Sequence, residues 1–348
     1  MSYSPFYSLQ EGNWFKLICG ASYQHLPSIR NLALIYTLAG ADCIDMAADR
    51  AVIHSALEGI KKAQDLFVEA KNQGYDSHFS PFVMVSINDG EDPHFRKAYF
   101  NPNLCPTDCP RPCESICPAD AITFSSIYRG VKSDLCYGCG RCLPICPLNL
   151  IQTESIFITI DTIVEWLDIL PIDAIEIHTQ EGHFSQFISV WKKLQPHLSK
   201  LKIIAISCPY TSNIMDYLQK ISDFISPLEI PLIWQTDGRP MSGDIGEGTT
   251  HLTIKYAQKL MNSNLKGFIQ LAGGTNEYTI KKLSELNLTS KVAGIAFGSK
   301  GRKIIADVLQ ELENISTTNQ IENYPDLLWK GVEIASSLVS PLKLASVS

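Results

Sequence analysis

The stretch Phe82–Asn88, which reads FVMVSIN, is a short apolar run of the length of a β-strand. Seven more runs of this kind occur along the chain, and nearly all of them lead into a segment with helical periodicity. The eight runs are Lys16–Ala21, Asp42–Ala47, Phe82–Asn88, Ala174–Thr179, Lys202–Cys208, Leu232–Asp237, Gly267–Ala272 and Val292–Phe297. Eight β/α units predict a closed (β/α)8 barrel around a parallel sheet, and an open doubly wound sheet is the alternative.

The run Phe82–Asn88 differs from the others because no helical pattern comes directly after it. A cysteine-rich segment, Tyr99–Glu154, comes next, and the helical pattern that completes the unit, Thr162–Leu170, appears only afterwards. We therefore expect residues 1–98 and 155–315 to form the barrel, with residues 99–154 inserted at the C-terminal face, where barrel active sites lie. Residues 316–348 are expected to form a linker and an amphipathic helix, Leu327–Val339, that docks on the barrel.

Composition narrows the classes of function. The 348 residues carry a formal net charge of −7, which gives no broad basic surface, so we expect no nucleic-acid partner. We find neither a transmembrane segment nor a secretory signal, and we expect a cytoplasmic protein. Eight of the 11 cysteines fall between Cys105 and Cys146, an arrangement that favours metal binding in a reducing compartment over disulfides.

The most specific motif of the chain is Cys136-x2-Cys139-x2-Cys142-x3-Cys146-Pro147. Bacterial ferredoxins carry this run, in which three closely spaced thiolates bind one iron–sulfur cluster and the fourth binds the other cluster. An upstream run, Cys105-x3-Cys109-x3-Cys113-x3-Cys117-Pro118, ends in the same way, so the two runs are pseudo-repeats. The crossover rule then predicts two ligand sets: Cys105, Cys109, Cys113 and Cys146 for cluster one, and Cys136, Cys139, Cys142 and Cys117 for cluster two.

The upstream run departs from ferredoxin spacing, because its first two gaps are three residues long. Pro106, Pro110 and Pro112 also remove N–H donors that would otherwise support the cluster. We expect a labile [4Fe–4S] cluster there, able to lose an iron and become [3Fe–4S]. Structural zinc is the alternative, but zinc sites usually take two CxxC pairs, and the Cys-Pro endings are typical of ferredoxins.

Strand alternation predicts an unusually polar barrel interior. Glu176 and His178 share one face of the run Ala174–Thr179, opposite Ile175 and Ile177. By the same logic further polar side chains point inward: Asp45, Ser86, Asn88, Gln235, Asp237 and Gln270. Two interpretations stay open, a ligand site in which Glu176 and His178 are catalytic and manage protons, and a structural hydrogen-bond network.

Two glycine-rich loops come after the seventh and eighth runs, where many barrels bind phosphate. They contain Gly273, Gly274, Thr275 and Asn276, and Gly298, Ser299, Lys300, Gly301 and Arg302. The second loop opens a helix whose free amides and neighbouring cations suit an anion. A phosphate-bearing ligand such as flavin mononucleotide (FMN) is therefore one hypothesis, and glycines that only permit turns are the other.

Trp14–Ser22, the two cysteine runs and Gln235–Asp244 together resemble the cyanobacterial light-dependent period (LdpA) family, and the resemblance extends over nearly the whole chain. It implies an iron–sulfur protein that reports cellular redox state, and hence light, to the circadian clock, with clock-input proteins as partners. We expect the clusters to exchange electrons with a carrier such as a ferredoxin or a quinone. The alternative is an oxidoreductase whose clusters pass electrons to a flavin or small molecule at the barrel mouth.

Overall fold

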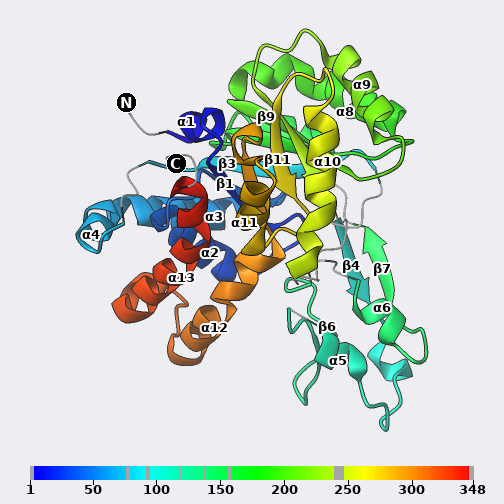
Figure 1. The fold of residues 1–348 in the computed structure, drawn as a ribbon. Coiled ribbons are helices and arrows are strands. Elements are labelled where there is room, and N and C mark those ends of the chain that lie inside the picture. The colour runs from blue at the N-terminus through cyan, green and yellow to red at the C-terminus, as the bar shows by residue number, and fades with distance from the viewer. Residues whose placement is uncertain are drawn as a thin grey trace.

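The computed structural model describes residues 4–75, 79–90, 95–117, 119–136, 138, 140–155, 158–238 and 247–344. Eight parallel strands close into a barrel in the order β1-β12-β11-β10-β9-β8-β3-β2 (Figure 1). These strands are β1 (Trp14–Gly20), β2 (Cys43–Ala47), β3 (Phe82–Asn88), β8 (Ala174–His178), β9 (Ile203–Pro209), β10 (Leu232–Asp237), β11 (Phe268–Ala272) and β12 (Gly294–Phe297). Each lies on one of the eight apolar runs, so the barrel prediction is confirmed and the open-sheet alternative is wrong.

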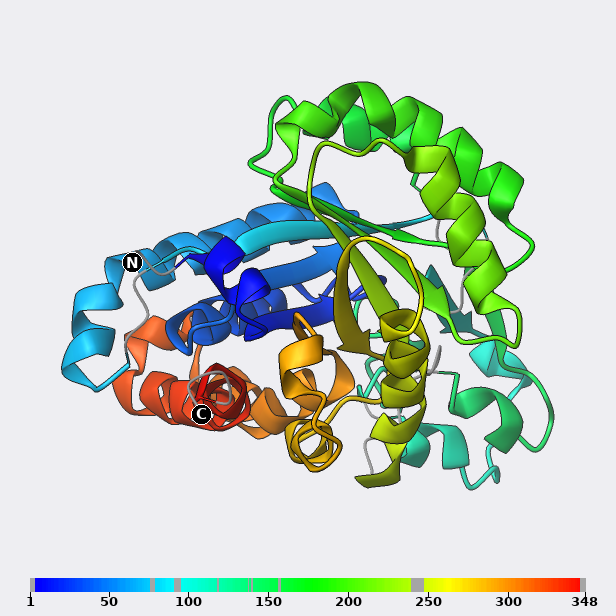
Figure 2. The same ribbon diagram turned by 45° about the horizontal axis from the view of Figure 1, so that its top comes forward.

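Helices surround the barrel on its outer side (Figure 2). They are α2 (Leu26–Leu38), α3 (Arg50–Asp65), α4 (Phe67–Asn72), α7 (Ile160–Trp166), α8 (Phe184–Leu194), α9 (Ile214–Ile225), α10 (His251–Met261), α11 (Tyr278–Glu285) and α12 (Ser299–Ile315). Short 3-10 turns lie at Gln195–Lys200, Glu247–Thr250, Thr289–Lys291 and Ile321–Asn323. The Asp49 carboxylate fixes the start of α3, since its Oδ1 accepts the backbone N–H groups of Ala51 and Val52 at 2.8 and 3.2 Å.

Two apolar layers hold the barrel together. Strand side chains such as Ile175 and Ile177 face outward into a large core shared with the helices. Inside the barrel a smaller apolar cluster includes Trp14, Phe82 and Met84. The short helix α1 (Pro5–Gln10) adds Leu9 to that inner cluster, so the inner layer is continuous with the N-terminal segment.

The helix α13 (Pro325–Leu344) packs against α2 and α12 (Figure 2). Its buried face contains Leu328, Val332, Ala335, Leu338 and Val339. Near its end Lys343 forms an ion pair with the buried Asp42. Neither α13 nor any other helix in the described part of the chain is long and apolar enough to span a bilayer.

The cysteine-rich segment lies between β3 and β8 and forms a lobe beside the barrel (Figure 1). Strands β4 (Arg96–Tyr99) and β7 (Gln152–Ser155) pair antiparallel where the chain enters and leaves this lobe. Within it are a 3-10 turn (Pro102–Leu104), α5 (Pro112–Ile116), the hairpin strands β5 (Ile122–Phe124) and β6 (Arg129–Val131), and α6 (Cys142–Ile145). We call residues 95–155 the cluster module.

Candidate functional site

The cysteines of the module surround two separate cavities. One cavity, the first thiol site, is lined by Cys105, Cys109, Cys113 and Cys146. The other, the second thiol site, is lined by Cys117, Cys136 and Cys142. Cys139, the fourth predicted ligand there, lies outside the described residues. In each site one thiol comes from the opposite pseudo-repeat, which is the crossover arrangement expected from the motif.

The two Cys-Pro endings have the same local geometry. Helix α5 ends directly before Cys117 and α6 directly before Cys146, and both cysteines are extended, with φ −72°, ψ 112° and φ −71°, ψ 112°. Three residues on, Asp120 and Asn149 both have a left-handed backbone, with φ 48° and 51°. The next residues, Ala121 and Leu150, donate backbone N–H groups to the Cys117 and Cys146 Sγ atoms at 3.3 and 3.4 Å. The pseudo-repeat seen in the sequence is therefore also a structural repeat.

Each thiol site suits a metal–sulfur cluster on chemical grounds. The walls are otherwise largely apolar, with Phe100, Phe124 and Ile151 at the first site, and Ala98 and Ile122 at the second. Burial would raise the pKa of Cys146, but backbone N–H groups led by that of Leu150 outweigh it and lower the pKa, whereas burial raises the pKa of Cys105 and of Cys113 at the same site.

The residues that line the two cavities fit an iron–sulfur cluster. Thiolates are the ligands that such clusters take, and the cysteines of each site come from both pseudo-repeats. A structural zinc ion, which four ligands would hold at one point, stays the alternative prediction for the same thiols.

A third, larger cavity of about 550 Å³ lies between the cluster module and the helices α2 and α12. Cys117 and Arg141 of the module line one side, so the cavity shares residues with the second thiol site. The first turns of α12 supply Ser299, Arg302 and Lys303 to the opposite side. Its size is within the range of small-molecule sites.

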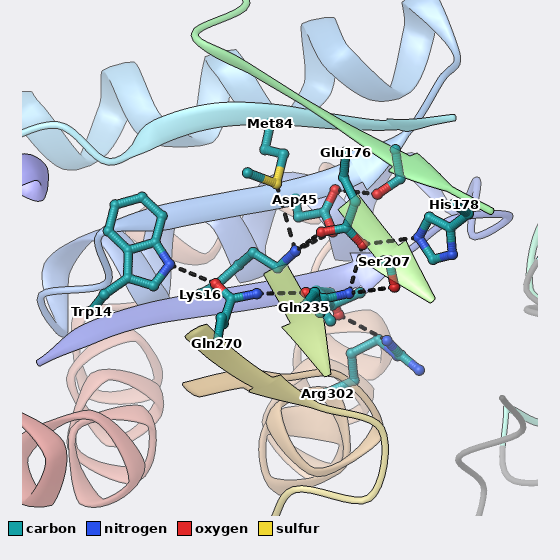
Figure 3. A network of polar contacts seen from close by, with 12 residues as sticks. Trp14, Lys16, Asp45, Met84, Glu176, His178, Ser207, Gln235, Gln270 and Arg302 are labelled. Carbon is teal, nitrogen blue, oxygen red and sulfur yellow. Dashed lines mark hydrogen bonds and ion pairs between the residues drawn. The ribbon is translucent and has the colours of Figure 1, made fainter. Parts of the chain in front are cut away.

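A network of buried polar side chains occupies the barrel interior, and it extends from Trp14 at the start of β1 to His178 at the end of β8 (Figure 3). Lys16 of β1 is fully buried, and its Nζ forms ion pairs with Glu176 and with Asp45, the latter at 3.3 Å. Glu176 Oε1 also accepts a hydrogen bond from Gln235 Nε2 at 2.7 Å and lies 2.9 Å from His178 Nε2. Ser86 donates to Asp45 Oδ1 at 2.7 Å, whereas Asp45 Oδ2 is buried without a hydrogen bond among the described residues and faces the cation of Lys16.

The network continues through two amides to Trp14, the first residue of β1 (Figure 3). Gln270 Nε2 donates to Gln235 Oε1, and the Trp14 indole donates to Gln270 Oε1 at 2.7 Å. Gln235 also reaches Ser207 at 3.0 Å. Asn88 and Asp237, the other two residues expected to point inward, are buried as well.

In this network the ammonium group of Lys16 pairs with two carboxylates, Asp45 and Glu176, and the pKa values of the two carboxylates shift in opposite directions. Burial raises the pKa of Asp45 to about 6, because the attraction of Lys16 offsets the burial only in part. Burial acts in the same direction on Glu176, but Lys16 and the hydrogen bond from His178 outweigh it and lower the pKa to about 2. Lys16 itself is strongly desolvated, yet the two carboxylates raise its pKa.

The two residues predicted as catalytic, Glu176 and His178, do lie together in the structure. Glu176 is fully buried, and the partners described for it are protein groups. His178 is the last residue of β8, and the Phe95 ring packs edge-on against its imidazole, with ring centroids 5.2 Å apart. This arrangement favours the structural-network interpretation for Glu176.

The two glycine-rich loops differ in how many of their polar groups form contacts within the barrel. Thr275 donates to Ala296 O, and Asn276 donates to Thr249 at 3.1 Å, while Thr249 itself donates to Gly274 O, so Gly273–Asn276 forms a closed turn. In the second loop Lys300 pairs with Glu277 at 2.7 Å, and Arg302 donates to Ile18 O at 2.8 Å. Gly298, before the first turn of α12, has no capping side chain, and Gly301 packs against Leu17. Only Ser299 and Arg302 of the predicted phosphate residues line the third cavity.

Two buried lysines, Lys16 and Lys97, were not among the residues predicted from the sequence. The sequence could have indicated Lys16, because it is a charged residue among apolar ones and strand alternation puts it on the same face as Trp14. Lys97 had none, since it lies just before the expected start of the insertion and its partners come from distant segments.

A closed parallel α/β barrel with an inserted iron–sulfur module is the class of protein that this fold and these thiol sites define. The comparisons identify both parts. The family model described as LdpA Fe-S cluster-binding domain matches residues 105–157, and that described as Light dependent period A C-terminal domain matches residues 166–341. The chain is 50% identical over 346 residues to Light dependent period A of Synechococcus elongatus, covering 98% of this chain and 94% of that protein.

The chain therefore belongs to the LdpA family, and it carries that family's iron–sulfur domain. A ferredoxin of Rickettsia felis is 30% identical over 56 residues, 16% of this chain and 47% of the ferredoxin. Among solved structures, (S)-3-O-geranylgeranylglyceryl phosphate synthase from Thermoplasma acidophilum aligns with a TM-score of 0.41 and 12% identity, covering 98% of this chain and all of that one.

Proposed function

We propose that this protein is a two-cluster redox sensor, whose cluster oxidation state changes its contacts with partner proteins. The observation that carries the proposal is the division of the described module cysteines between two separate cavities. On this proposal Cys105, Cys109, Cys113 and Cys146 bind cluster one, and Cys117, Cys136, Cys139 and Cys142 bind cluster two. When bound, each cluster accepts or gives up one electron at a time.

The two clusters should differ in stability. We expect cluster two to be a [4Fe–4S] cluster, because its cysteines have ferredoxin spacing. Cluster one is the weaker of the two, because its loop carries Pro106, Pro110 and Pro112 and longer gaps between cysteines. We expect it to convert between [4Fe–4S] and [3Fe–4S]. A cluster that loses iron readily suits a sensor better than a plain electron carrier.

The light and clock role rests on the family. The relative in Synechococcus elongatus is named Light dependent period A, and half of the aligned residues are identical. We propose that this chain likewise couples redox state to clock timing, receiving electrons from a ferredoxin or a quinone and contacting clock-input proteins. The barrel supports this role as a scaffold, since its buried charges already compensate one another.

Iron analysis of anaerobically purified full-length protein tests the proposal. We expect about eight iron atoms per chain, from two clusters of four. Cys105→Ser and Cys136→Ser should each remove one of the two electron paramagnetic resonance (EPR) signals that appear on reduction. Cys208→Ser is the matched control, because Cys208 is a buried thiol of the barrel, and it should keep both signals. Stoichiometric zinc without iron would refute the proposal.

A second candidate is an oxidoreductase, and the third cavity favours it. Its volume of about 550 Å³ admits a ligand, Cys117 brings it beside cluster two, and Ser299, Arg302 and Arg141 offer donors to a phosphate. Electrons would then pass from cluster two to FMN or another phosphate-bearing molecule in this cavity, rather than at the barrel mouth. The catalytic role expected for Glu176 and His178 at the barrel mouth stays a prediction.

Native protein distinguishes the two candidates. Denaturation followed by mass analysis and a visible spectrum of the released small molecules should yield a flavin or phosphorylated ligand if the second candidate holds. The sensor predicts no such ligand and no binding of added FMN. Arg141→Met should weaken FMN binding on the second candidate, whereas Lys259→Met, on the distant helix α10, should leave it unchanged.

A further inference from the structure

Lys97 is a fully buried cation inside the contact between the cluster module and the barrel. It lies on β4, at the point where the chain enters the module, and its side chain has no exposure to solvent. Its Nζ donates to Gln24 Oε1 at 2.7 Å and to the backbone carbonyl of Ser133. Both acceptors are neutral, and among the described residues Lys97 forms no ion pair.

This environment contrasts with that of Lys16, the other fully buried lysine. Lys16 lies between two carboxylates, whereas burial lowers the pKa of Lys97. A buried ammonium without a carboxylate partner is expensive, so a compensating negative charge nearby is expected.

The second thiol site supplies such a charge. Ala98, the next residue on β4, donates its backbone N–H to Cys136 Sγ at 3.4 Å. Ser133, whose carbonyl accepts from Lys97 Nζ, lies three residues before Cys136 in the same turn of chain. The ammonium therefore lies within the electrostatic field of any cluster that Cys136 holds.

The acceptors of Lys97 also join the module to the barrel. Gln24, in the loop after β1, receives Lys97 on its carbonyl and donates from its Nε2 to Asp49 Oδ2 at 2.8 Å. Its backbone N–H donates to Asp134 O at 3.1 Å. The other carboxylate oxygen of Asp49 caps α3. A path thus runs from Cys136 to the backbone of Ala98, along the chain to its neighbour Lys97, and through Gln24 and Asp49 to a barrel helix.

We propose that Lys97 is a positioning residue that raises the reduction potential of the cluster bound by Cys136 and fastens that cluster to the barrel through Gln24. This inference rests on the proposed function, because it requires a cluster at the second thiol site. Reduction adds one electron, and so one negative charge, to the cluster. A nearby buried cation stabilises the reduced state more than the oxidised state, and net charge near a cluster is one of the factors that set its potential.

EPR-monitored titration of the full-length protein with dithionite, the electron donor, tests the inference. Lys97→Met keeps the length of the side chain and removes its charge, so we expect a lower midpoint potential for the Cys136 cluster and little change for the Cys105 cluster. The control is Lys132→Met, which removes an exposed charge four residues from Cys136 and should shift the midpoint several-fold less. The Cys105→Ser and Cys136→Ser proteins assign the two signals.

A second variant separates charge from attachment. Gln24→Leu keeps the ammonium but breaks the link to Asp49, so we expect faster hydrogen exchange in residues 130–136 with a much smaller change in potential. If Lys97→Met destroys the Cys136 cluster, Lys97→Gln, which retains a hydrogen-bonding group, takes its place in the titration.

The outcomes distinguish the inference from the proposed function. A wild-type protein without iron contradicts the proposed function itself. Two intact clusters whose midpoints in Lys97→Met match those in Lys132→Met overturn the inference alone. Loss of the Cys136 cluster from both Lys97 variants also overturns it, because Lys97 would then hold the site together instead of setting its potential.

Discussion

The barrel interior and the cluster module bury chemically active side chains in opposite ways. In the barrel, Lys16, Asp45 and Glu176 bring opposite charges together from three strands, and Ser86 and Gln235 donate hydrogen bonds to the two carboxylates. In the module, thiols line two cavities whose walls offer them mainly apolar surface and backbone N–H groups. The buried charges of the barrel thus find partners within the chain, whereas we expect the module to depend on the metal that it binds.

Removal of iron should have the largest effect, because we expect it to unfold the cluster module and to leave the barrel folded. The apolar cluster of the module is small, and three of its buried members are the thiols Cys113, Cys136 and Cys142. A lobe of this size with so little core needs its metal to stay folded. We expect chelated protein to be cleaved by protease within residues 95–155 while the barrel stays folded, as measured by mass spectrometry and circular dichroism. Equal protease resistance with and without iron would contradict the comparison.

Lys16→Met should have the next largest effect, this time on the barrel. It leaves two carboxylates buried without their cation, and breaking a buried ion pair in this way costs about 3–5 kcal/mol. Urea denaturation followed by circular dichroism measures the loss. The double variant Lys16→Met/Glu176→Gln should recover part of it, because one of the two unpaired charges is gone. A loss under about 1 kcal/mol in the single variant would mean that water reaches the network.

The pH dependence of stability should reveal the unequal sharing of Lys16. The folded-state pKa of Asp45, about 6, lies above its unfolded value, so its contribution is fully present at low pH and is lost as pH rises from about 4 through 6. Asp45→Asn should remove that decline, on the order of 1–3 kcal/mol. Urea denaturation between pH 4 and 7 provides the measurement, with the exposed Asp168→Asn as control.

Glu176 should show the opposite slope at lower pH. Its folded-state pKa, about 2, lies below its unfolded value, so its contribution is present above about pH 4.5 and is lost as pH falls towards 2. Identical pH profiles for wild-type and Asp45→Asn protein would argue that the two carboxylates share Lys16 equally.

Lys200→Met should have the smallest effect. Lys200 pairs with Asp168 on the surface, where both side chains are substantially exposed. Such pairs contribute about 0–1 kcal/mol and weaken in salt. The same urea experiment should therefore separate this variant clearly from Lys16→Met, and similar losses for both would remove the distinction between buried and surface ion pairs.

The local parts of this molecule could be predicted from the sequence, and the partners from distant segments could not. The strand Phe82–Asn88 and the cysteine spacing from Cys136 to Cys146 are written in consecutive residues, so periodicity and motif are enough to find them. Alternation also placed Glu176 inside the barrel. One partner of Glu176 is Lys16, which lies on a strand far away in sequence, and only closure of the barrel brings the two together.

The residues predicted to bind phosphate also show that contacts with distant segments cannot be predicted from local sequence. Gly273–Asn276 and Gly298–Arg302 share a composition, and nothing in it separates a closed turn from a cavity wall. The difference arises because Thr275 and Asn276 find acceptors within the barrel, whereas Ser299 and Arg302 face the module. Lys97 is the extreme case, since neither of its acceptors is near it in sequence.

The antiparallel pairing of β4 with β7 has a consequence for how the chain folds. It pairs Arg96 with Ser155 across the base of the module, and so brings the end of β3 close to the start of α7, the helix that leads into β8. Loop closure costs conformational entropy that grows with the length of the loop. A module that has already folded around iron shortens the effective loop between β3 and β8. Metal loading during synthesis should therefore speed the closure of the barrel, although none of the proposed cluster ligands belongs to the barrel itself.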